Sequence, residues 1–598
     1  MTSVVVLSMW LFLGTSPPAA VVPIPVPDVA TVAAATADVA SVPGAKPPIG
    51  YRDASGSVDS LVQDYLRVTV RRGSLKPQRG YWAAEVTLHN GDAQPHPVRL
   101  SFRPSYGDVT HSVVRTVELA PRQRLVTWLM APVAWHSGAL TVEVPGLPSI
   151  TEHLFPDNDR YEPVLVVGNS ESFEAATGLS KTPEQEDPLF SVRFIDAQEA
   201  PRELAAYAGF EMVVLTEAAT KVPADVWAVL ESYALSGGRL VVANPPRDLR
   251  ERLQLLQSVP LQDAPYAFGG VWTCDNSAAT CRHKIQSELS TVTDDNRGKT
   301  RPQGLRSRWA SKVSFGDDEA PLLGTARAPV GPFLLLMTAF ALLVGPGAWW
   351  LTKRRGPVAV LIAVPAVSLV TCVVLIAWSV LVDGFAVHTA RYSLTYLDGA
   401  RARAVTVGLS GWYANLSPEP LRLPSSSVLI APHDTEDLMA DLDWTGGLTV
   451  GDGFLPPRTY REWGELAVVP SRARLVLVET GGEPKVQNAL GIVVEEGIVR
   501  WKGQVRRLPR LADGEEGALG PPEPDPSPSQ GNAADTLLES SLGAPAQYRL
   551  KAALPLFRRD LKEQEFVVRT SGPGPLPTSA ASAEVEASVH LIRGEVRP

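Results

Sequence analysis

Cysteine is scarce in this chain, whose 598 residues include only three. So small a number excludes a fold held by many disulfides and an iron–sulfur protein with several cysteine clusters. An excess of basic residues is missing as well, because 55 Lys and Arg stand against 64 Asp and Glu, a formal charge of −9. Nucleic-acid binding needs a concentrated basic face, so we expect no nucleic-acid partner.

The usual motifs of nucleotide and metal chemistry are also absent. The sequence contains no G-x-G-x-x-G, no P-loop and no H-E-x-x-H. Its nine histidines are scattered singly along the chain. We therefore expect no cofactor and no resident metal, and function has to be inferred from the architecture.

Two long segments lack charged residues altogether: residues 328–352 and 356–382. About 20 apolar residues are enough for a helix to cross the hydrocarbon core of a bilayer, and both segments are longer. Buried core helices rarely run this far without a charge. The sequence therefore predicts two transmembrane helices and makes the lipid bilayer a partner of the chain.

A short basic turn, Lys353, Arg354 and Arg355, separates the two segments. Such a turn joins the helices as a hairpin, and the positive-inside rule places it in the cytoplasm. Both flanking regions, which make up most of the chain, are then expected outside the cytoplasm. The predicted location is the bacterial inner membrane, with most of the chain periplasmic.

The N-terminus is consistent with export. An apolar run from Val4 to Gly14 has the length of a signal-peptide core. No Lys or Arg precedes that run, so residues 1–37 are interpreted as a signal peptide or, alternatively, an uncleaved anchor. Residues 38–59 are rich in Ala and Pro and are interpreted as a tether.

The cysteines are interpreted in the same compartment. Cys372 lies inside the second apolar segment. Cys274 and Cys281 lie in a loop-rich extension, residues 264–327, where oxidising conditions favour a local disulfide. A metal site that also uses His283 is the alternative, although two Cys and one His do not complete a structural zinc shell.

Residues 60–157 alternate between apolar and polar side chains, with Gly, Pro, Asn and Asp between the runs. Short strands at this spacing predict a β-sandwich. The pattern resembles the immunoglobulin-like modules of bacterial surface proteins, which act as spacers or binding platforms.

The pattern changes in residues 158–263. "YEPVLVVGNS" is a continuous apolar strand, and "LFSVRFIDA", "FEMVVLTEA" and "GRLVVANP" are others. A helix, "PADVWAVLESYAL", lies between the last two. Alternating strands and helices predict a doubly wound α/β layer.

The stretch "FEMVVLTEAATKVPADVWAVLESYALSGGRLVVANP" resembles the late strand–helix–strand unit of type-1 glutamine-amidotransferase-like domains, which have a flavodoxin-like fold. The resemblance covers about 100 residues and implies a fold rather than an activity. Catalytic members use a Cys nucleophile with His and Glu partners. No Cys and no His occurs between Arg160 and Val259, so the triad does not carry over.

Other catalytic candidates in this layer are single polar residues. Ser170 follows the first strand, but no base is identifiable beside it. Glu217 and Asp225 are interpreted as marking a strand end and a first helical turn. Thr216 and Thr220 supply further hydroxyls, and Lys221 is a nearby lysine whose position before a helix predicts solvent exposure. We predict no catalytic residue and no amidotransferase chemistry.

After the hairpin, residues 383–598 predict a further β-rich domain outside the cytoplasm, with an unstructured linker at 520–532. The whole order is similar to uncharacterised bacterial envelope proteins with a "GP-x-x-x-x-x-L-x-R-R" hairpin. The favoured hypothesis is a non-catalytic binding or scaffold protein, whose partner is an envelope protein such as a transport component, or a glycan. The alternative is an envelope hydrolase with an unrecognised site in the α/β layer.

Overall fold

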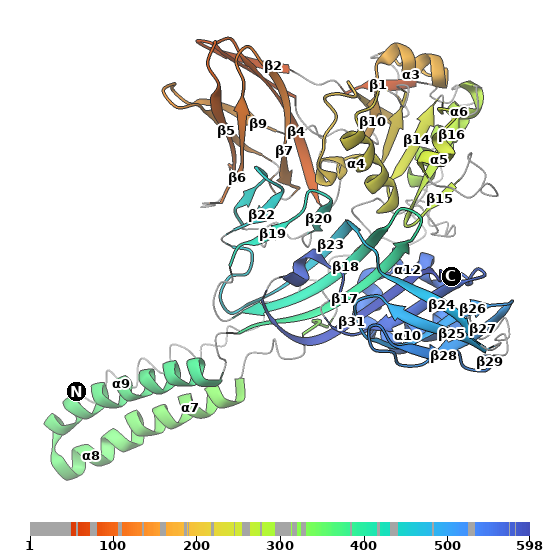
Figure 1. Cartoon of the computed structure of the whole chain (residues 1–598). Coiled ribbons are helices and arrows are strands. Elements are labelled where there is room, and N and C mark those ends of the chain that lie inside the picture. Colours follow the sequence, from red (N-terminus) through yellow and green to blue (C-terminus); the bar gives the residue numbers. More distant parts are fainter. Residues whose placement is uncertain are drawn as a thin grey trace, which may run out of the picture. The chain divides into compact units, whose positions relative to one another are not determined.

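The structure is a computed structural model of the chain (Figure 1). It describes residues 50–54, 58–71, 80–105, 111–133, 135, 137–155, 163–183, 188, 190–216, 221–243, 245–253, 264–274, 278–293, 313, 320–323, 330–382, 386–414, 419–430, 440–451, 453–480, 483–523, 533–572, 574–580 and 582–597. The predicted signal peptide or anchor lies outside the described residues, and so do residues 38–49 and 55–57 of the predicted tether. The chain is multidomain and rich in β-sheet.

The first β domain is a sandwich of two sheets. A four-stranded antiparallel sheet has the order β2 (Val58–Gln63), β3 (Leu66–Arg71), β4 (Tyr81–Asn90) and β7 (Arg124–Pro132). A seven-stranded sheet has the order β19 (Leu421–Leu423), β22 (Leu448–Val450), β21 (Leu442–Asp443), β6 (Val113–Leu119), β5 (His96–Pro104), β8 (Gly138–Glu143) and β9 (Ile150–Leu154).

The alternating pattern explains how these sheets pack. Val68 and Val86 point into the sandwich from the first sheet, and both are fully buried. Trp82 meets Phe102 of the second sheet edge to face, with ring centroids 5.2 Å apart. The intervening residues, such as Arg67, lie on the outer face, as a period of two requires.

The boundary predicted for the C-terminal domain needs correction. Strands β19, β21 and β22 follow the apolar hairpin in sequence, yet they extend the sandwich that precedes it. β21 pairs in parallel with β6, with Leu442 opposite Val113. Trp444 Nε1 also donates to the carbonyl of Met130, 3.0 Å away. The parts of the chain on either side of the hairpin therefore share one sheet.

The α/β layer contains an eight-stranded sheet. Its order is β11 (Ser180–Lys181), β1 (Gly50–Asp53), β12 (Phe190–Ile195), β10 (Pro163–Val167), β13 (Met212–Leu215), β14 (Arg239–Ala243), β16 (Gly269–Cys274) and β15 (Ala264–Tyr266). All its neighbours pair in parallel except β15 and β16. From β12 to β16 the order is 2-1-3-4-5 in chain terms, a doubly wound arrangement.

Helices cover both faces of this parallel sheet. α3 (Ser170–Thr177) and α6 (Ala278–Thr293) pack on one face, and α4 (Ala224–Leu235) with the 3₁₀ helix η1 (Leu204–Tyr207) packs on the other. Because both faces are covered, the central strands β10 and β13 are entirely apolar and fully buried. A four-residue helix, α5 (Leu249–Arg252), follows β14.

The α/β layer differs from its predicted boundaries at both ends. β1 comes from the predicted tether, and its four residues insert between β11 and β12. β15, β16 and α6 come from the predicted loop-rich extension and form the far edge of the sheet. Both corrections have one cause, because these short strands are placed by their partners in the sheet rather than by their own sequence patterns.

The third large sheet has nine strands. Its order is β20 (Ser427–Ile430), β23 (Thr459–Pro470), β18 (Arg403–Ala414), β17 (Val387–Asp398), β31 (Glu584–Glu595), β30 (Glu565–Thr570), β26 (Val494–Trp501), β27 (Gln504–Leu508) and β29 (Pro522–Glu523). Only β17 and β31 pair in parallel. Of the predicted linker 520–532, only residues 520–523 are described, and two of them form β29.

Two further layers cover part of this sheet. A three-stranded sheet of β24 (Arg474–Thr480), β25 (Glu483–Ala489) and β28 (Glu516–Ala518) shares one apolar cluster with it. Three helices share a second apolar cluster with the nine-stranded sheet: α10 (Ala533–Ser541), α11 (Ala544–Leu550) and α12 (Leu554–Arg558). A final 3₁₀ turn, η6 (Pro577–Ala580), precedes β31.

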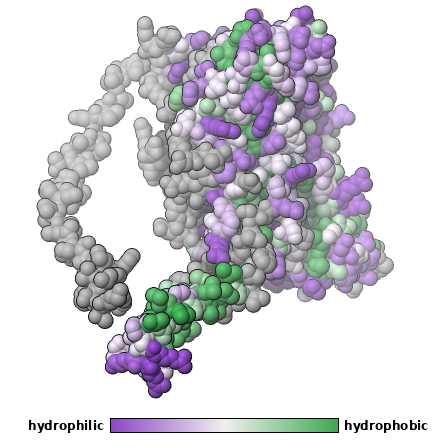
Figure 2. Space-filling view, turned by 90° about the vertical axis from the view of Figure 1, so that its left-hand side faces the viewer, coloured by the Kyte–Doolittle hydropathy of each residue, from purple (hydrophilic) through white to green (hydrophobic). Residues whose placement is uncertain are grey.

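The apolar segments form a helical hairpin. α7 (Val330–Leu342) continues through a π-helical turn, Leu343–Gly347, into α8 (Ala348–Arg355), and α9 (Pro357–Val382) returns. Residues 334–355 and 357–377 are long and apolar enough to cross a membrane, and the apolar part of neither segment is buried in the protein. Figure 2 shows the apolar flank of the hairpin in green and its tip in purple.

The basic residues do not form a separate loop as predicted. Lys353, Arg354 and Arg355 are the last turn of α8, where cations interact favourably with the helix dipole. Gly356 alone makes the turn, with φ of +83°, a value that L residues rarely adopt. A single non-helical residue therefore joins the two arms of the hairpin.

Candidate functional site

The carboxyl ends of β10 and β13 are where a doubly wound sheet of this order forms its crevice. β10 leads into Gly168, Asn169 and Ser170. Gly168 has φ of +140° and donates its N–H to the carbonyl of Ile195, 2.8 Å away. The Asn169 side chain caps α3 by accepting from the N–H of Ser172 at 2.8 Å. In the amidotransferase-like domains that the sequence resembles, the nucleophile lies at such a strand-to-helix turn.

Ser170 has the right position, but no described side chain serves as its base. It is the first residue of α3 and is exposed. Within the described part of the chain, no side chain hydrogen-bonds its hydroxyl. Glu171 follows it in the first turn and adds negative charge where an oxyanion would need positive charge. The described residues therefore supply no activated nucleophile at this turn.

The neighbouring polar residues have structural roles. Thr216 is buried and donates its hydroxyl to the carbonyl of Val167 at 3.2 Å, which holds the ends of β13 and β10 together. Asp225 lies in the first turn of α4 and pairs with Arg202 at 2.7 Å. That hydrogen bond holds the pKa of Asp225 below its ordinary value. Lys221 is exposed. Glu217 and Thr220 lie outside the described residues.

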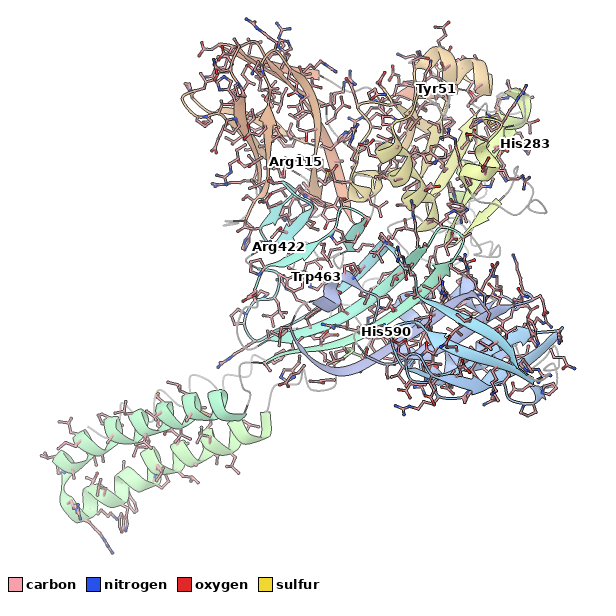
Figure 3. The ribbon with its side chains drawn as sticks, viewed as in Figure 1. Tyr51, Arg115, His283, Arg422, Trp463 and His590 are labelled. Atoms are coloured by element: carbon pink, nitrogen blue, oxygen red, sulfur yellow. A yellow bond between two sulfur atoms is a disulfide. The ribbon has the colours of Figure 1, made fainter. Side chains whose placement is uncertain are left out.

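Cys274 and Cys281 are joined by a disulfide that ties the end of β16 to the first turns of α6. His283, two residues further on, is exposed on α6 (Figure 3). A metal site at this position is not supported, because the two cysteine sulfurs are bonded to each other and are not available as thiolate ligands. No group of three metal-ligand side chains occurs in the described ranges. Cys372 lies on α9 as an exposed free thiol.

The hairpin tip combines basic and indole side chains. The Lys353 ammonium lies 3.7 Å from the ring centroid of Trp349, and the Arg354 guanidinium lies 4.3 Å from that of Trp350. Lys353, Arg354 and Arg355 are all exposed. Indole and cationic groups at one end of an apolar helix are typical of a membrane–water interface.

A cationic cavity lies on the outer face of the four-stranded sheet, far in sequence from the predicted candidates. Its volume is about 270 Å³. The lining side chains come from β3, β4 and β7 and are all polar: Arg67, Thr69, Arg71, Thr87, His89 and Arg124. We call this the sandwich cavity. Sequence reasoning missed it, because its residues meet only through the strand register.

Carboxylates partner two of the three arginines at the sandwich cavity. Glu85, almost fully buried on β4, lies 3.4 Å from Arg71. Glu199, which follows β12, pairs with Arg124. Neither Arg67 nor His89 has a side-chain partner among the residues that the structure describes. The cavity therefore keeps a positive centre.

A serine–histidine pair occurs in the nine-stranded sheet. Ser393 Oγ lies 2.7 Å from His590 Nδ1, and Ser588 Oγ lies 2.7 Å from Nε2 (Figure 3). Such a pair activates nucleophiles in enzymes, but Ser393 and His590 are completely buried. Burial also lowers the pKa of His590 to about 4. His590 is therefore a neutral core histidine with both ring nitrogens hydrogen-bonded.

Comparison with known proteins gives no family for this chain. No protein-family model and no curated protein matches it. A cycloisomaltooligosaccharide glucanotransferase of Paenibacillus sp. aligns at 15% identity and a TM-score of 0.14. β-Glucuronidase 2 of Bacteroides uniformis aligns at 8% and 0.12, and the exo-chitosanase of Amycolatopsis orientalis at 9% and 0.11.

These alignments are partial as well as weak. They cover 27%, 32% and 42% of this chain, and 20%, 25% and 27% of the three enzymes. TM-scores this low carry no argument about fold or activity. The chain is therefore characterised by its own features: a β-rich multidomain fold with two helices able to cross a membrane.

Proposed function

We propose that this chain is a membrane-anchored binding or scaffold protein of the bacterial cell envelope. The helical hairpin anchors it in the inner membrane, and the β-rich and α/β domains lie on the periplasmic side. There they bind an envelope protein, such as a transport component, or a glycan. The α/β layer serves as a degenerate amidotransferase-like scaffold without catalysis.

One observation carries the proposal: the chain before the hairpin and the chain after it build one body. β6 and β21 share a sheet, with Leu442 opposite Val113. Glu231 of α4 pairs with Arg403 of β18 at 3.1 Å. If both helices cross a bilayer, the two flanks must lie on the same side of it, since they are hydrogen-bonded to each other.

Further contacts connect the domains of this body. Arg115 of β6 pairs with Glu203, next to η1, at 2.6 Å, and both side chains are mostly buried (Figure 3). The N–H of Leu204 donates to the carbonyl of Ser425 at 3.0 Å. Domains connected in this way present one continuous surface rather than moving independently, as a scaffold requires.

The side of the membrane follows from charge. The only exposed basic cluster on the described part of the hairpin is Lys353, Arg354 and Arg355 at its tip. Cytoplasmic retention of such residues sets the orientation of short hairpins. The tip is then cytoplasmic and the body periplasmic, and a three-residue cluster leaves no room for an effector domain between the helices.

Replacing residues 330–382 with a flexible Gly/Ser linker is expected to release the protein from the membrane without unfolding it. The reason is that the β6–β21 pairing does not involve the helices. Membrane fractionation and tryptophan fluorescence measure the two effects, in a chain whose residues 1–37 are replaced by a cleavable export signal. The matched control, Arg354→Glu, keeps both helices and should stay in the membrane. A folded linker variant that remains membrane-bound contradicts the anchor role.

The hydrolase alternative makes a different prediction. Amidotransferase chemistry needs an activated thiolate, or a hydroxyl with a base in reach. Ser170 supplies a hydroxyl, but no described residue serves as its base. We expect the purified full chain in detergent to release no ammonia from glutamine. Release that disappears on Ser170→Ala, with Ser172→Ala as the matched control, would show that the α/β layer is an enzyme.

A further inference from the structure

We propose that the sandwich cavity binds an acidic glycan, meaning a hydroxyl-rich polymer that carries carboxylate or phosphate groups. This inference rests on the proposed binding function and supplies its ligand class. None of the residues predicted from sequence takes part in it. The argument uses the register of three strands, the charges that line the cavity, and the side chains that it lacks.

The strand register places three nitrogen-bearing side chains in one row. Arg67 of β3 lies directly opposite His89 of β4, and His89 lies directly opposite Arg124 of β7. Neighbouring strands are about 4.8 Å apart, so the row spans roughly 10 Å. All three side chains belong to exposed residues. The row therefore offers donors at intervals close to the size of one monosaccharide.

A second row supplies hydroxyl groups. Thr69 lies opposite Thr87, one step along the same face of β3 and β4. Both line the cavity. Threonine hydroxyls donate and accept hydrogen bonds, which suits the hydroxyls of a sugar or polyol. Guanidinium groups suit the oxyanions, because they donate two parallel hydrogen bonds to a carboxylate or phosphate.

The charge balance favours an anion. Arg71 and Arg124 are neutralised by Glu85 and Glu199. Arg67 has no such partner in the described part of the chain, and His89 adds a further donor at the centre of the row. A cationic ligand would face Arg67 without compensation. An anionic group bound between Arg67 and His89 would supply the negative charge that Arg67 lacks and an acceptor for His89.

The lining also disfavours other macromolecules. It contains no Phe, Tyr or Trp, so the large aromatic platforms on which nucleic-acid bases stack are missing. The volume of about 270 Å³ lies just below the usual range of about 300–1,000 Å³ for small-molecule sites. A single acidic sugar unit fits such a space. The open rim lets the polymer continue beyond it.

The test measures binding of defined probes to the full chain in detergent. Fluorescence anisotropy would follow a labelled oligogalacturonate, which carries carboxylates, and a labelled poly(glycerol phosphate), which carries phosphates. Fully methyl-esterified oligogalacturonate is the neutral probe. The variants are Arg67→Gln and His89→Gln. Arg103→Gln is the matched control, because Arg103 is also exposed on the sandwich but lies on β5, away from the cavity.

We expect at least one acidic probe to bind at low salt, and raised salt to weaken that binding because charge drives it. Arg67→Gln should weaken binding at least tenfold, His89→Gln should weaken it less, and Arg103→Gln should leave it unchanged. The preferred probe identifies the anion as carboxylate or phosphate.

Several results would overturn the assignment. They are equal binding of the neutral ester, equal weakening by Arg103→Gln, or no binding of either acidic probe. The unfolding curve of each variant, measured in parallel, separates lost binding from lost fold. A failure here leaves the anchor role intact, since the linker replacement tests that role independently.

Discussion

Arg593→Leu is expected to lower the free energy of unfolding by about 3–5 kcal/mol, the cost of breaking a buried ion pair from one side. Arg593 is completely buried on β31 and binds Glu565 of β30 through two hydrogen bonds, of 2.9 and 2.7 Å. Burial would raise the pKa of Glu565, but the hydrogen bond and charge of Arg593 outweigh it and keep that pKa below its ordinary value.

The same guanidinium also holds the end of α12. It donates to four backbone carbonyls at 2.9–3.1 Å, those of Leu556, Phe557, Arg559 and Asp560. Carbonyls at a helix end lack intrahelical partners, so losing Arg593 leaves them unsatisfied as well. Leucine fills part of the volume but donates no hydrogen bond.

Urea unfolding followed by tryptophan fluorescence measures the effect in the full chain. The matched control is Arg510→Leu, which breaks the exposed pair between Arg510 and Glu495, 2.9 Å apart. Exposed pairs contribute about 0–1 kcal/mol, so this variant should remain close to the wild type. If Arg593→Leu and Arg510→Leu cost the same, the buried network does not hold the sheet together.

Glu465→Gln is expected to stabilise the protein by about 3 kcal/mol more at pH 8 than at pH 4.5. Glu465 lies on β23 and is 1% exposed. Burial raises the pKa of Glu465 to about 7, against the opposing hydrogen bond from Thr578 at 2.6 Å. Glutamine has the shape of the protonated carboxyl and does not ionise.

The sign follows from proton counts. Between pH 4.5 and 7 the folded state keeps a proton on Glu465 that the unfolded state has lost, so stability falls as the pH rises. His590 acts in the opposite direction. With its pKa lowered to about 4 by burial, it resists protonation that the unfolded state accepts below about 6.5, so stability falls as the pH falls.

The two groups belong to one row of the sheet, because Glu465 faces Gly408, Gly408 faces Ser393, and Ser393 faces His590. Their opposite slopes should nearly cancel in the wild type between pH 4.5 and 6.5. Thermal melts at half-unit pH steps should show a flat profile for the wild type and one rising with pH for Glu465→Gln. Parallel profiles for the two proteins would show that Glu465 is ionised throughout.

The sequence predicted the kinds of layers better than their boundaries. The alternation in "YWAAEVTLHN" identifies β4 because ten residues give a clear period of two. The apolar run "PVLVV" identifies β10 because a strand covered on both faces has no polar side chains. Both signals are contained within a few consecutive residues, so they can be recognised in a single sequence.

The short strands were not predicted, because their positions depend on residues distant in the sequence. β21 has two residues and β22 has three, too few for any periodicity, and their places are set by pairing with distant strands. β1, with the sequence "GYRD", has no apolar run at all. The sandwich cavity depends on the register of β3, β4 and β7, since a shift by one residue would turn Arg67 or His89 to the other face.

The most direct test of the account is the sidedness of three single cysteines in intact cells. Glu118→Cys lies before the hairpin, Glu516→Cys lies after it, and Arg354→Cys lies at its tip; all three positions are exposed. With Cys372 replaced by serine, a membrane-impermeant thiol reagent should label positions 118 and 516 once the outer membrane is opened. It should label position 354 only after the inner membrane is permeabilised. Labelling of position 354 together with 118, or of 118 without 516, would contradict an anchored periplasmic body.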